Sequence, residues 1–477
     1  MLTVSTGIFS SRVLGLARDM IFAYVFGTGR ALAAFVIAFT FPNLLRALLG
    51  EGAFNNVFVP VFNAERERSG KAAAWAQACR VISVLAMVLA VLVFLVSAGV
   101  ALARPWVSDE LGTLVLRLTP VLMPYAIFIC VAGALGGVLN SIDRFGVAAY
   151  SPVIMNVCLI GAALVFARFG TGDGNGGWTL AAAVLLAGVL QLLWHLHACR
   201  REGLAFRLDP VVGDPAVGRV ARLMAPVLIG TGVVQLNVVV DRVLAGILGS
   251  AATTSLYYSQ RLVYLPVSLF GVAMGTVVLP ALSRTWAAGD VEGMRRSVAK
   301  ALNTVLFLSI PVVALLAALR YPVVRLLFER GGFDSESTRE TVWALLFYLP
   351  GIPVFACAKV AVTPFYARQD TRTPVRVAAW CLGLNVVLNL VLMQFLAQGG
   401  LALATSICSF VNVGVLLTLA FRQMGGAGLR ELCVRTLRMI FAGVIVFVVT
   451  VTVLGWMPTG DGLALKILHV AVPGLIG

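Results

Sequence analysis

Ser11-Arg12-Val13-Leu14-Gly15-Leu16-Ala17-Arg18-Asp19 lies in the middle of the first apolar segment of the chain, residues 3–27. This stretch contains three charged residues, although a helix that crosses a membrane is ordinarily apolar. An ionised side chain at bilayer depth costs at least about 2.5–3.5 kcal/mol, so such residues are expected to face a polar cavity or a partner. Arg46 and Arg261 repeat the pattern in other apolar segments. Arginines gathered inside a membrane protein indicate that it handles an anion.

The composition of the 477 residues is that of a membrane protein, because 60% are hydrophobic and only 12% are charged. The mean hydropathy is +0.97. Apolar residues come in blocks of about 20, enough for a helix to cross roughly 30 Å of hydrocarbon. Backbone polar groups in lipid must be satisfied within each helix, so we expect an all-α polytopic membrane protein with about 14 transmembrane helices, the last one incomplete. The predicted spans are 3–27, 32–62, 75–103, 112–140, 147–169, 177–198, 219–248, 253–283, 297–319, 340–366, 374–397, 400–421, 433–456 and the short 462–477.

The net charge of +15 is distributed as a topology signal. Basic residues concentrate in alternate loops, including 66–71, 200–219 and 284–300, whereas 249–252 and 398–400 contain no Lys or Arg. This bias predicts a cytoplasmic N-terminus and argues against a nucleic-acid site. The eight cysteines are scattered singly without a CxxC motif, which predicts neither a metal cluster nor a disulfide framework.

Short segments recur along the chain at an offset of about 220 residues. Residues 25–28 (VFGT) resemble residues 247–250 (ILGS). Residues 54–62 resemble residues 274–282, and both of these segments have a proline at the seventh position. An offset that spans an even number of crossings implies two lobes in the same orientation, which enclose a central site and support alternating access. The predicted division is an N-terminal lobe at 1–212, a C-terminal lobe at 213–428, and two further helices, the second partial, at 429–477.

The intramembrane arginines are the first candidate site. Arg12 and Arg18 are six residues apart and differ by about 120° on a helix, so both can border one wide cavity. Asn43 and Arg46 are three apart and share a face. Guanidinium groups bind phosphate through paired hydrogen bonds. The alternative is that each arginine neutralises a nearby acid, as Arg18 could do with Asp19, or lies at the membrane interface.

Asp241, Asn385, Asn389 and Thr405 form the second candidate site. Asn385 and Asn389 are four residues apart and are therefore stacked on one helix face. Oxygen ligands of this kind suit a small hard cation. The alternative is that these side chains make interhelical hydrogen bonds.

The sequence predicts a transporter rather than an enzyme, and we assign no catalytic residue. It has no nucleophile elbow, P-loop or HExxH motif, and its 21 acidic residues are mostly single and in loops. A membrane-embedded glycosyl- or phosphotransferase, the alternative from a different class, would need acidic residues for a metal or a base. The two-lobe repeat favours a carrier over a channel, because it suits rocking around one site.

Several motifs resemble the MurJ (MviN) family of lipid II flippases, within the multidrug/oligosaccharidyl-lipid/polysaccharide (MOP) exporter superfamily. The resemblance covers almost the whole chain. Its motifs are the opening stretch, Phe41-Pro42-Asn43-Leu44-Leu45-Arg46, Glu51-Gly52-Ala53-Phe54, Tyr257-Tyr258-Ser259-Gln260-Arg261-Leu262, Leu279-Pro280-Ala281-Leu282-Ser283, and Phe365-Tyr366-Ala367-Arg368-Gln369-Asp370-Thr371-Arg372-Thr373-Pro374.

The resemblance implies roles for individual residues. Arg12, Arg18, Arg46 and Arg261 match arginines that line the family's cationic cavity, and Thr254 falls where a small hydroxyl residue is common. Ala33 and Asn389 depart from the family, because many members carry a carboxylate at each position. The implied sodium ligands are Asp241, Asn385, Asn389, Thr405 and the backbone carbonyl of Leu401.

The resemblance also implies a function in peptidoglycan synthesis, and hence in cell-wall biogenesis and cell shape. The expected substrate is undecaprenyl-pyrophosphoryl-MurNAc-pentapeptide-GlcNAc, moved from the inner to the outer leaflet of a bacterial plasma (inner) membrane. The expected assembly is a monomer among membrane lipids, associated with cell-wall synthesis proteins, with a sodium ion as the one candidate cofactor. The alternatives within the superfamily are a flippase for another polyprenyl-linked glycan and a cation-coupled drug exporter, although an exporter of cations should have buried acids.

Overall fold

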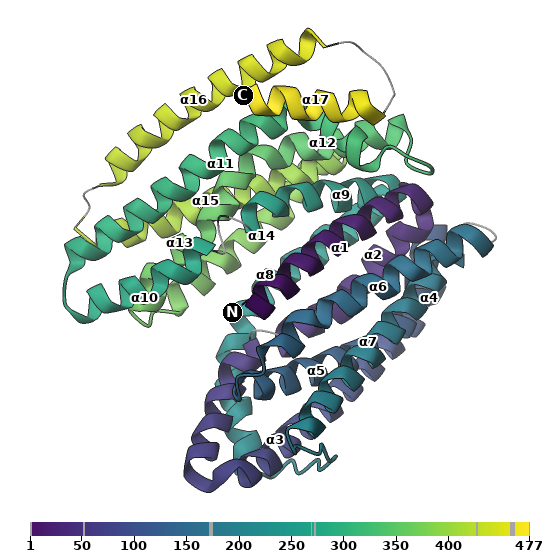
Figure 1. Cartoon of the computed structure of the whole chain (residues 1–477), viewed down its shortest axis with the longest axis vertical. Helices are drawn as coiled ribbons and strands as arrows, with labels where there is room; N and C mark the ends of the chain where they lie inside the picture. The colour runs from purple at the N-terminus through teal and green to yellow at the C-terminus, as the bar shows by residue number, and fades with distance from the viewer. Residues whose placement is uncertain are drawn as a thin grey trace. The chain divides into compact units, whose positions relative to one another are not determined.

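The computed structural model describes residues 2–50, 53–170, 175–268, 270, 273–425, 428–457 and 463–476. Every regular element in these ranges is helical, and the elements can be followed from purple to yellow in Figure 1. The predicted all-helical fold is confirmed. The chain divides into two compact units, Met1–Ser250 and Ala251–Gly477.

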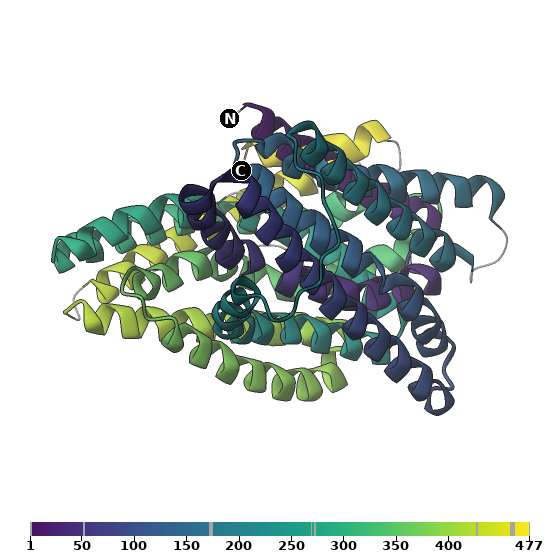
Figure 2. The ribbon, with the colours of Figure 1, turned by 90° about the horizontal axis from the view of Figure 1, so that it is seen from below.

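The first unit contains eight long helices and two short helical turns among its described residues. α8 packs against α2 and α3, so it belongs to this unit. The predicted lobe boundary at 212 comes from sequence repeats rather than from packing, and it stays a prediction. The elements, drawn from purple to teal in Figures 1 and 2, are α1 (Leu2–Phe26), α2 (Arg30–Leu45), a π-helix η1 (Arg46–Gly50), α3 (Ala53–Ala103), η2 (Arg104–Trp106), α4 (Glu110–Leu122), α5 (Tyr125–Asn140), α6 (Phe145–Phe169), α7 (Asn175–Arg201) and α8 (Pro215–Leu248).

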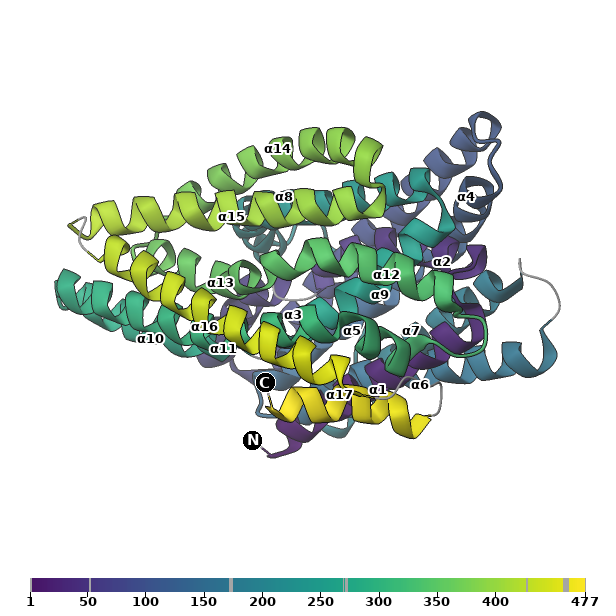
Figure 3. The same ribbon diagram turned by 90° about the horizontal axis from the view of Figure 1, so that it is seen from above.

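In the second unit, α14 packs along α15, and α16 packs along α11, as Figure 3 shows. The first four turns of α11, most of α13 and the C-terminal half of α15 supply a core that includes Leu302, Val360 and Phe421. The elements are α9 (Ser250–Val267), α10 (Ala273–Ala287), α11 (Val291–Phe328), α12 (Ser335–Tyr348), η4 (Leu349–Gly351), α13 (Ile352–Ala367), α14 (Arg372–Leu396), α15 (Gln398–Gln423), α16 (Leu429–Gly455) and α17 (Leu463–Ile476).

Nine helical stretches among the described residues are long and apolar enough to cross a membrane, or up to ten if α4 and α5 count as one bent span. One of the nine runs from Arg30 to Trp106 and covers two of the predicted spans, 32–62 and 75–103. Within it, α3 is kinked at Gly70, whose φ of 82° separates two helices, so the break between the two spans falls in the predicted loop at 66–71. Glycine adopts such positive φ values without steric cost.

Three predicted spans are interrupted in the structure. The span at 112–140 is α4 and α5, which meet at an angle of 42° next to Pro124. The span at 340–366 is α12 and α13, separated by Leu349-Pro350-Gly351. The span at 253–283 is α9 and α10, and part of the connection between them lies outside the described residues. Proline removes a backbone donor, and this explains the first two breaks.

Candidate functional site

Arg18 and Asp19, neighbours on α1, form an ion pair. The Nε and Nη2 atoms of Arg18 lie 3.0 and 2.7 Å from Oδ1 of Asp19. The side chains are 14% and 4% exposed. The acid therefore compensates the arginine charge locally, as one of the alternatives from the sequence predicts.

Asn156 on α6 holds the same guanidinium from a second helix. Arg18 Nη1 donates to Asn156 Oδ1 at 3.0 Å, and Asn156 Nδ2 donates to the carbonyl of Ser11 at 3.0 Å. The two helices approach closely at Gly7, where an added Cβ would lie 3.0 Å from the carbonyl oxygen of Ala149. Close packing of α1 on α6 thus fixes the position of Arg18.

Arg12 lies on the same helix in a different environment. Its side chain is exposed, and no carboxylate pairs with it among the residues that the structure describes. Arg18 shares its charge with Asp19, so Arg12 contributes the uncompensated positive charge on this part of α1. A diphosphate would need such a charge.

Arg46 begins the π-helix η1, immediately after α2. Its Nε donates to Asn43 Oδ1 at 2.9 Å, so the two residues do share a face. Glu51 and Gly52, which follow in the quoted motif, lie outside the described residues.

The π-helix is locked against α5 by two glycines. A Cβ added at Gly133 would lie 2.3 Å from the carbonyl oxygen of Gly50, and one added at Gly50 would lie 2.9 Å from Sγ of Cys130. Asn55 at the start of α3 also donates to the carbonyl of Gly133 at 3.2 Å. This packing gives η1, and therefore Arg46, a defined place in the first unit. Short π-helical turns often occur at functional sites.

Arg261 lies on α9 in the second unit. Its guanidinium carbon is 4.6 Å from the ring centroid of Tyr257, and Nη2 donates to the Tyr257 hydroxyl at 3.2 Å. The residues are four apart and therefore neighbours on the helix surface. The aromatic face supports the cation and leaves much of the guanidinium exposed.

Neighbouring side chains anchor α9 in the second unit. Tyr258 is fully buried among Phe328 and Phe333. Ser259 Oγ donates to the carbonyl of Thr341 at 2.8 Å. Thr254 is also fully buried, and its hydroxyl donates to the carbonyl of Ala251 at 3.2 Å.

The predicted cation ligands of the second unit lie on two helices that pack together, α14 and α15. Asn385 and Asn389 are almost completely buried, and Asn389 Nδ2 donates to Asn385 Oδ1 at 2.7 Å. Thr405 Oγ1 donates to the carbonyl of Leu401 at 3.0 Å. Asp241 lies on α8 in the first unit, so its place in this set stays a prediction, as does the shared cavity for arginines of both units.

Sequence reasoning missed Asn156 and Tyr257 as partners of the arginines. Tyr257 carried a usable signal, because it precedes Arg261 by four residues on a predicted helix. Asn156 carried a weaker one, since it is an amide within the apolar segment 147–169. Its contact with Arg18 bridges 138 residues and cannot be read from spacing.

Comparison with known proteins assigns the family. The model of the family described as "Lipid II flippase MurJ" matches residues 22–464. This chain belongs to the MurJ lipid II flippase family. Among MurJ relatives, the lipid II flippase MurJ of Burkholderia cenocepacia is 33% identical over 435 residues, which are 89% of this chain and 84% of that protein. The probable lipid II flippase MurJ of Vibrio cholerae is 34% identical over 87% of this chain and 81% of its own length.

Solved structures agree with the MurJ assignment. A lipid II flippase MurJ in an inward closed conformation matches 100% of this chain and 98% of its own, with a TM-score of 0.82 and 25% identity. An inward-facing multidrug MATE transporter of the MOP superfamily covers 87% of this chain and 95% of its own with a TM-score of 0.72. At 14% identity, this second likeness shows the fold alone. The chain is a multi-pass membrane protein of a transporter family.

Proposed function

We propose that this chain moves lipid II, undecaprenyl-pyrophosphoryl-MurNAc-pentapeptide-GlcNAc, from the inner to the outer leaflet of the bacterial inner membrane. The observation that carries the proposal is the part-buried Arg18, whose guanidinium is held by Asp19 and Asn156 within an apolar helix of a MurJ-family chain. Lipid II combines a diphosphate, which arginines bind, with a tail that stays in hydrocarbon.

Arg12 and Arg18, the two arginines of α1, have different roles in this proposal. Arg12 supplies net charge for the diphosphate, because no described carboxylate pairs with it. Arg18 is fixed by three hydrogen bonds and offers a preorganised surface for the polar head of the substrate. Arg46 and Arg261 complete the proposed set, with Asn43 holding Arg46 and Tyr257 supporting Arg261. Thr254 is retained as a substrate-binding candidate on the family match alone.

Alternating access supplies the transport step in this proposal. The two compact units rock, and the head group crosses while its charge stays compensated. A flippase for another polyprenyl-linked glycan would share the diphosphate chemistry. A cation-coupled drug exporter should have buried acids that can bind its cargo, whereas the carboxylate of the buried Asp19 is paired with Arg18.

A sodium ion is the one cofactor proposed. Asn385, Asn389, Thr405 and the carbonyl of Leu401 offer neutral oxygens on two packed helices, and Asp241 would add the single carboxylate. The burial of the two amides fits an ion held away from water. The proposed ligands are amide, hydroxyl and carbonyl oxygens with one carboxylate, and oxygen ligands suit a hard ion better than a transition metal. Thermal stability of the purified chain should rise more in sodium than in equal potassium, and the Asp241→Asn variant should lose the difference. If the wild type has the same melting temperature in sodium and in potassium, the sodium site is contradicted, and these residues are assigned to interhelical hydrogen bonding.

Complementation tests the transport proposal in cells. Cells depleted of their own lipid II flippase should regain growth and lipid II flipping when they express this chain. The Arg12→Ala and Arg18→Ala variants should insert normally and fail to restore growth. Growth that depends on neither arginine, or no rescue by a well-inserted wild type, would contradict the proposal.

A further inference from the structure

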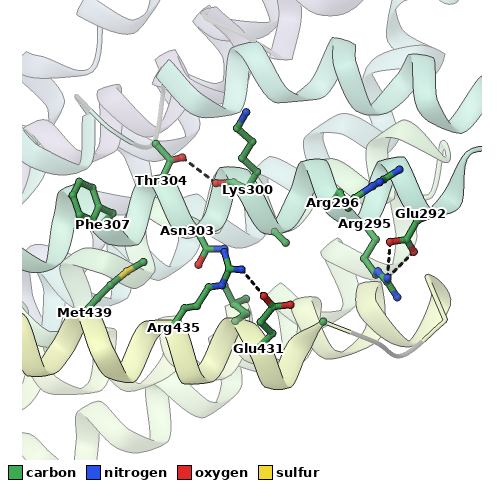
Figure 4. Close-up of a pocket in the computed structure, with 13 residues that line it drawn as sticks. Glu292, Arg295, Arg296, Lys300, Asn303, Thr304, Phe307, Glu431, Arg435 and Met439 are labelled. Carbon is green, nitrogen blue, oxygen red and sulfur yellow. Dashed lines mark hydrogen bonds and ion pairs between the residues drawn. The ribbon is translucent and has the colours of Figure 1, made fainter.

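A cleft of about 740 Å³ lies between the first half of α11 and the start of α16 in the second unit. Figure 4 shows that Arg435 reaches from α16 towards Asn303 on α11, beside Glu431. Neither helix carries a residue of the candidate transport site. The lining residues are Glu292, Arg295, Arg296, Ala299, Lys300, Asn303, Thr304, Phe307, Gly428, Glu431, Leu432, Arg435 and Met439.

The lining of the cleft is basic. It contains four basic and two acidic side chains, which gives a net charge of +2. Arg295 pairs with Glu292 at 2.6 Å, and Arg435 pairs with Glu431. Arg296 and Lys300 have no carboxylate partner among the residues that the structure describes. Both helices also begin at this end, and no side chain caps α16, so its first N–H groups add positive potential.

The cleft lies where both helices change from charged to apolar. On α11, Lys300 is followed by the stretch 301–319, which contains no charged residue. On α16 the last basic residue is Arg438, and 439–455 contain no charged residue. A change at the same level on two packed helices marks the boundary between head groups and hydrocarbon.

The apolar end of the cleft continues this pattern. Phe307, which is 63% exposed, and Met439 lie at its hydrocarbon end. The Oδ1 atom of Asn303 is buried and has no hydrogen-bond partner among the described residues. It is an acceptor that lacks a donor, between the basic and the apolar ends.

We propose that this cleft binds one anionic glycerophospholipid of the bilayer, which bridges α11 and α16. The basic side chains hold the phosphate, and an acyl chain follows Phe307 and Met439. The Lys/Arg bias assigns the site to the cytoplasmic leaflet, since the basic stretch 284–300 includes the first turns of α11. A soluble acidic peptide would satisfy the charges but would leave the apolar end unfilled.

Native mass spectrometry of the purified full chain tests the site. The probes are phosphatidylglycerol and phosphatidylcholine with the same acyl chains. We expect the wild type to retain one more molecule of phosphatidylglycerol than of phosphatidylcholine. The double variant Lys300→Ala/Arg435→Ala removes one cation from each wall and should weaken phosphatidylglycerol binding about thirtyfold, since each basic residue at a membrane surface contributes about 1 kcal/mol.

A matched control removes the same charge elsewhere. Arg200→Ala/Arg201→Ala, at the exposed end of α7, should retain phosphatidylglycerol as the wild type does. Phosphatidylglycerol should also raise the melting temperature of the wild type and of this control more than that of the cleft variant. Equal retention by all three proteins, equal retention of the two lipids, or equally strong binding of the soluble head group glycerophosphoglycerol would overturn the proposal.

Discussion

Arg18, which is part-buried, donates two hydrogen bonds to the buried Asp19, the next residue along α1. The carboxylate occupies Nε and Nη2, while Asn156 accepts from Nη1. The guanidinium is therefore fixed in three directions before any substrate arrives. Preorganisation of this kind reduces the entropy that binding must overcome.

The Arg18→Lys variant should lower lipid II flipping by at least about tenfold. Lysine keeps the charge but lacks the planar guanidinium that donates to Asp19 and Asn156 at the same time. One hydrogen bond to a charged group contributes about 1.5–3 kcal/mol. The rate of lipid II flipping by the purified variant measures the effect. The control is Arg200→Lys, on the exposed end of α7, which should leave the rate of flipping unchanged. Wild-type flipping by Arg18→Lys would mean that a point charge suffices.

Tyr257 should contribute through its ring more than through its hydroxyl. Tyr257→Phe keeps the aromatic face under Arg261 and should slow flipping about threefold at most, whereas Tyr257→Leu should slow it about tenfold. The comparison needs equal amounts of folded protein, checked by thermal unfolding. Equal rates for the Phe and Leu variants would assign no role to the cation–π contact.

The contact of Gly133 with Gly50 should be required for folding of the first unit. Gly133→Ala places a Cβ 2.3 Å from a backbone oxygen and should lower the free energy of unfolding by about 1–3 kcal/mol. Gly161→Ala on α6 meets no atom within 4 Å and is the matched control, with no loss expected. Thermal unfolding in detergent measures both. A similar melting temperature for the two variants would contradict the close approach.

Glu329 should make the second unit sensitive to acid. Thr338 Oγ1 donates to its carboxylate at 2.8 Å, Arg325 Nε donates at 3.1 Å, and Lys466 Nζ lies at 3.6 Å. Burial alone would raise the pKa of Glu329, but the hydrogen bonds from Thr338 and Arg325 outweigh it and lower the pKa below its ordinary value. A depressed pKa in the folded state stabilises the protein above the ordinary pKa, and this stabilisation disappears as the pH falls through the folded-state pKa.

The Glu329→Gln variant should therefore unfold at lower temperature near neutral pH, with a loss of about 1–3 kcal/mol, and should approach the wild type in acid. Glu336→Gln is the control, because Glu336 and Arg339 form an exposed ion pair of little energetic value. Melting temperatures measured between neutral and acidic pH distinguish the two. A constant difference between Glu329→Gln and the wild type at every pH would exclude the proposed linkage.

The sequence predicts most of the fold but not the contacts of the candidate site. Apolar blocks predict helices because hydropathy and helix length follow from local composition. Breaks within a predicted span are harder to predict: the break at Gly70 falls in the predicted loop 66–71, whereas the bend next to Pro124 lies inside the predicted span 112–140. The proximity of Arg18 and Asp19 in the sequence suggests an ion pair as one alternative. Asn156, the other partner of Arg18, lies on another helix, and its contact cannot be predicted from spacing.

Reconstitution tests the central claim most directly. The purified chain is placed in liposomes that contain fluorescent lipid II in the inner leaflet, and the appearance of lipid II in the outer leaflet is measured. We predict flipping by the wild type, none above protein-free liposomes for Arg18→Ala, and wild-type flipping for Arg200→Ala. No flipping by folded wild-type protein, or equal flipping by Arg18→Ala, would contradict the account.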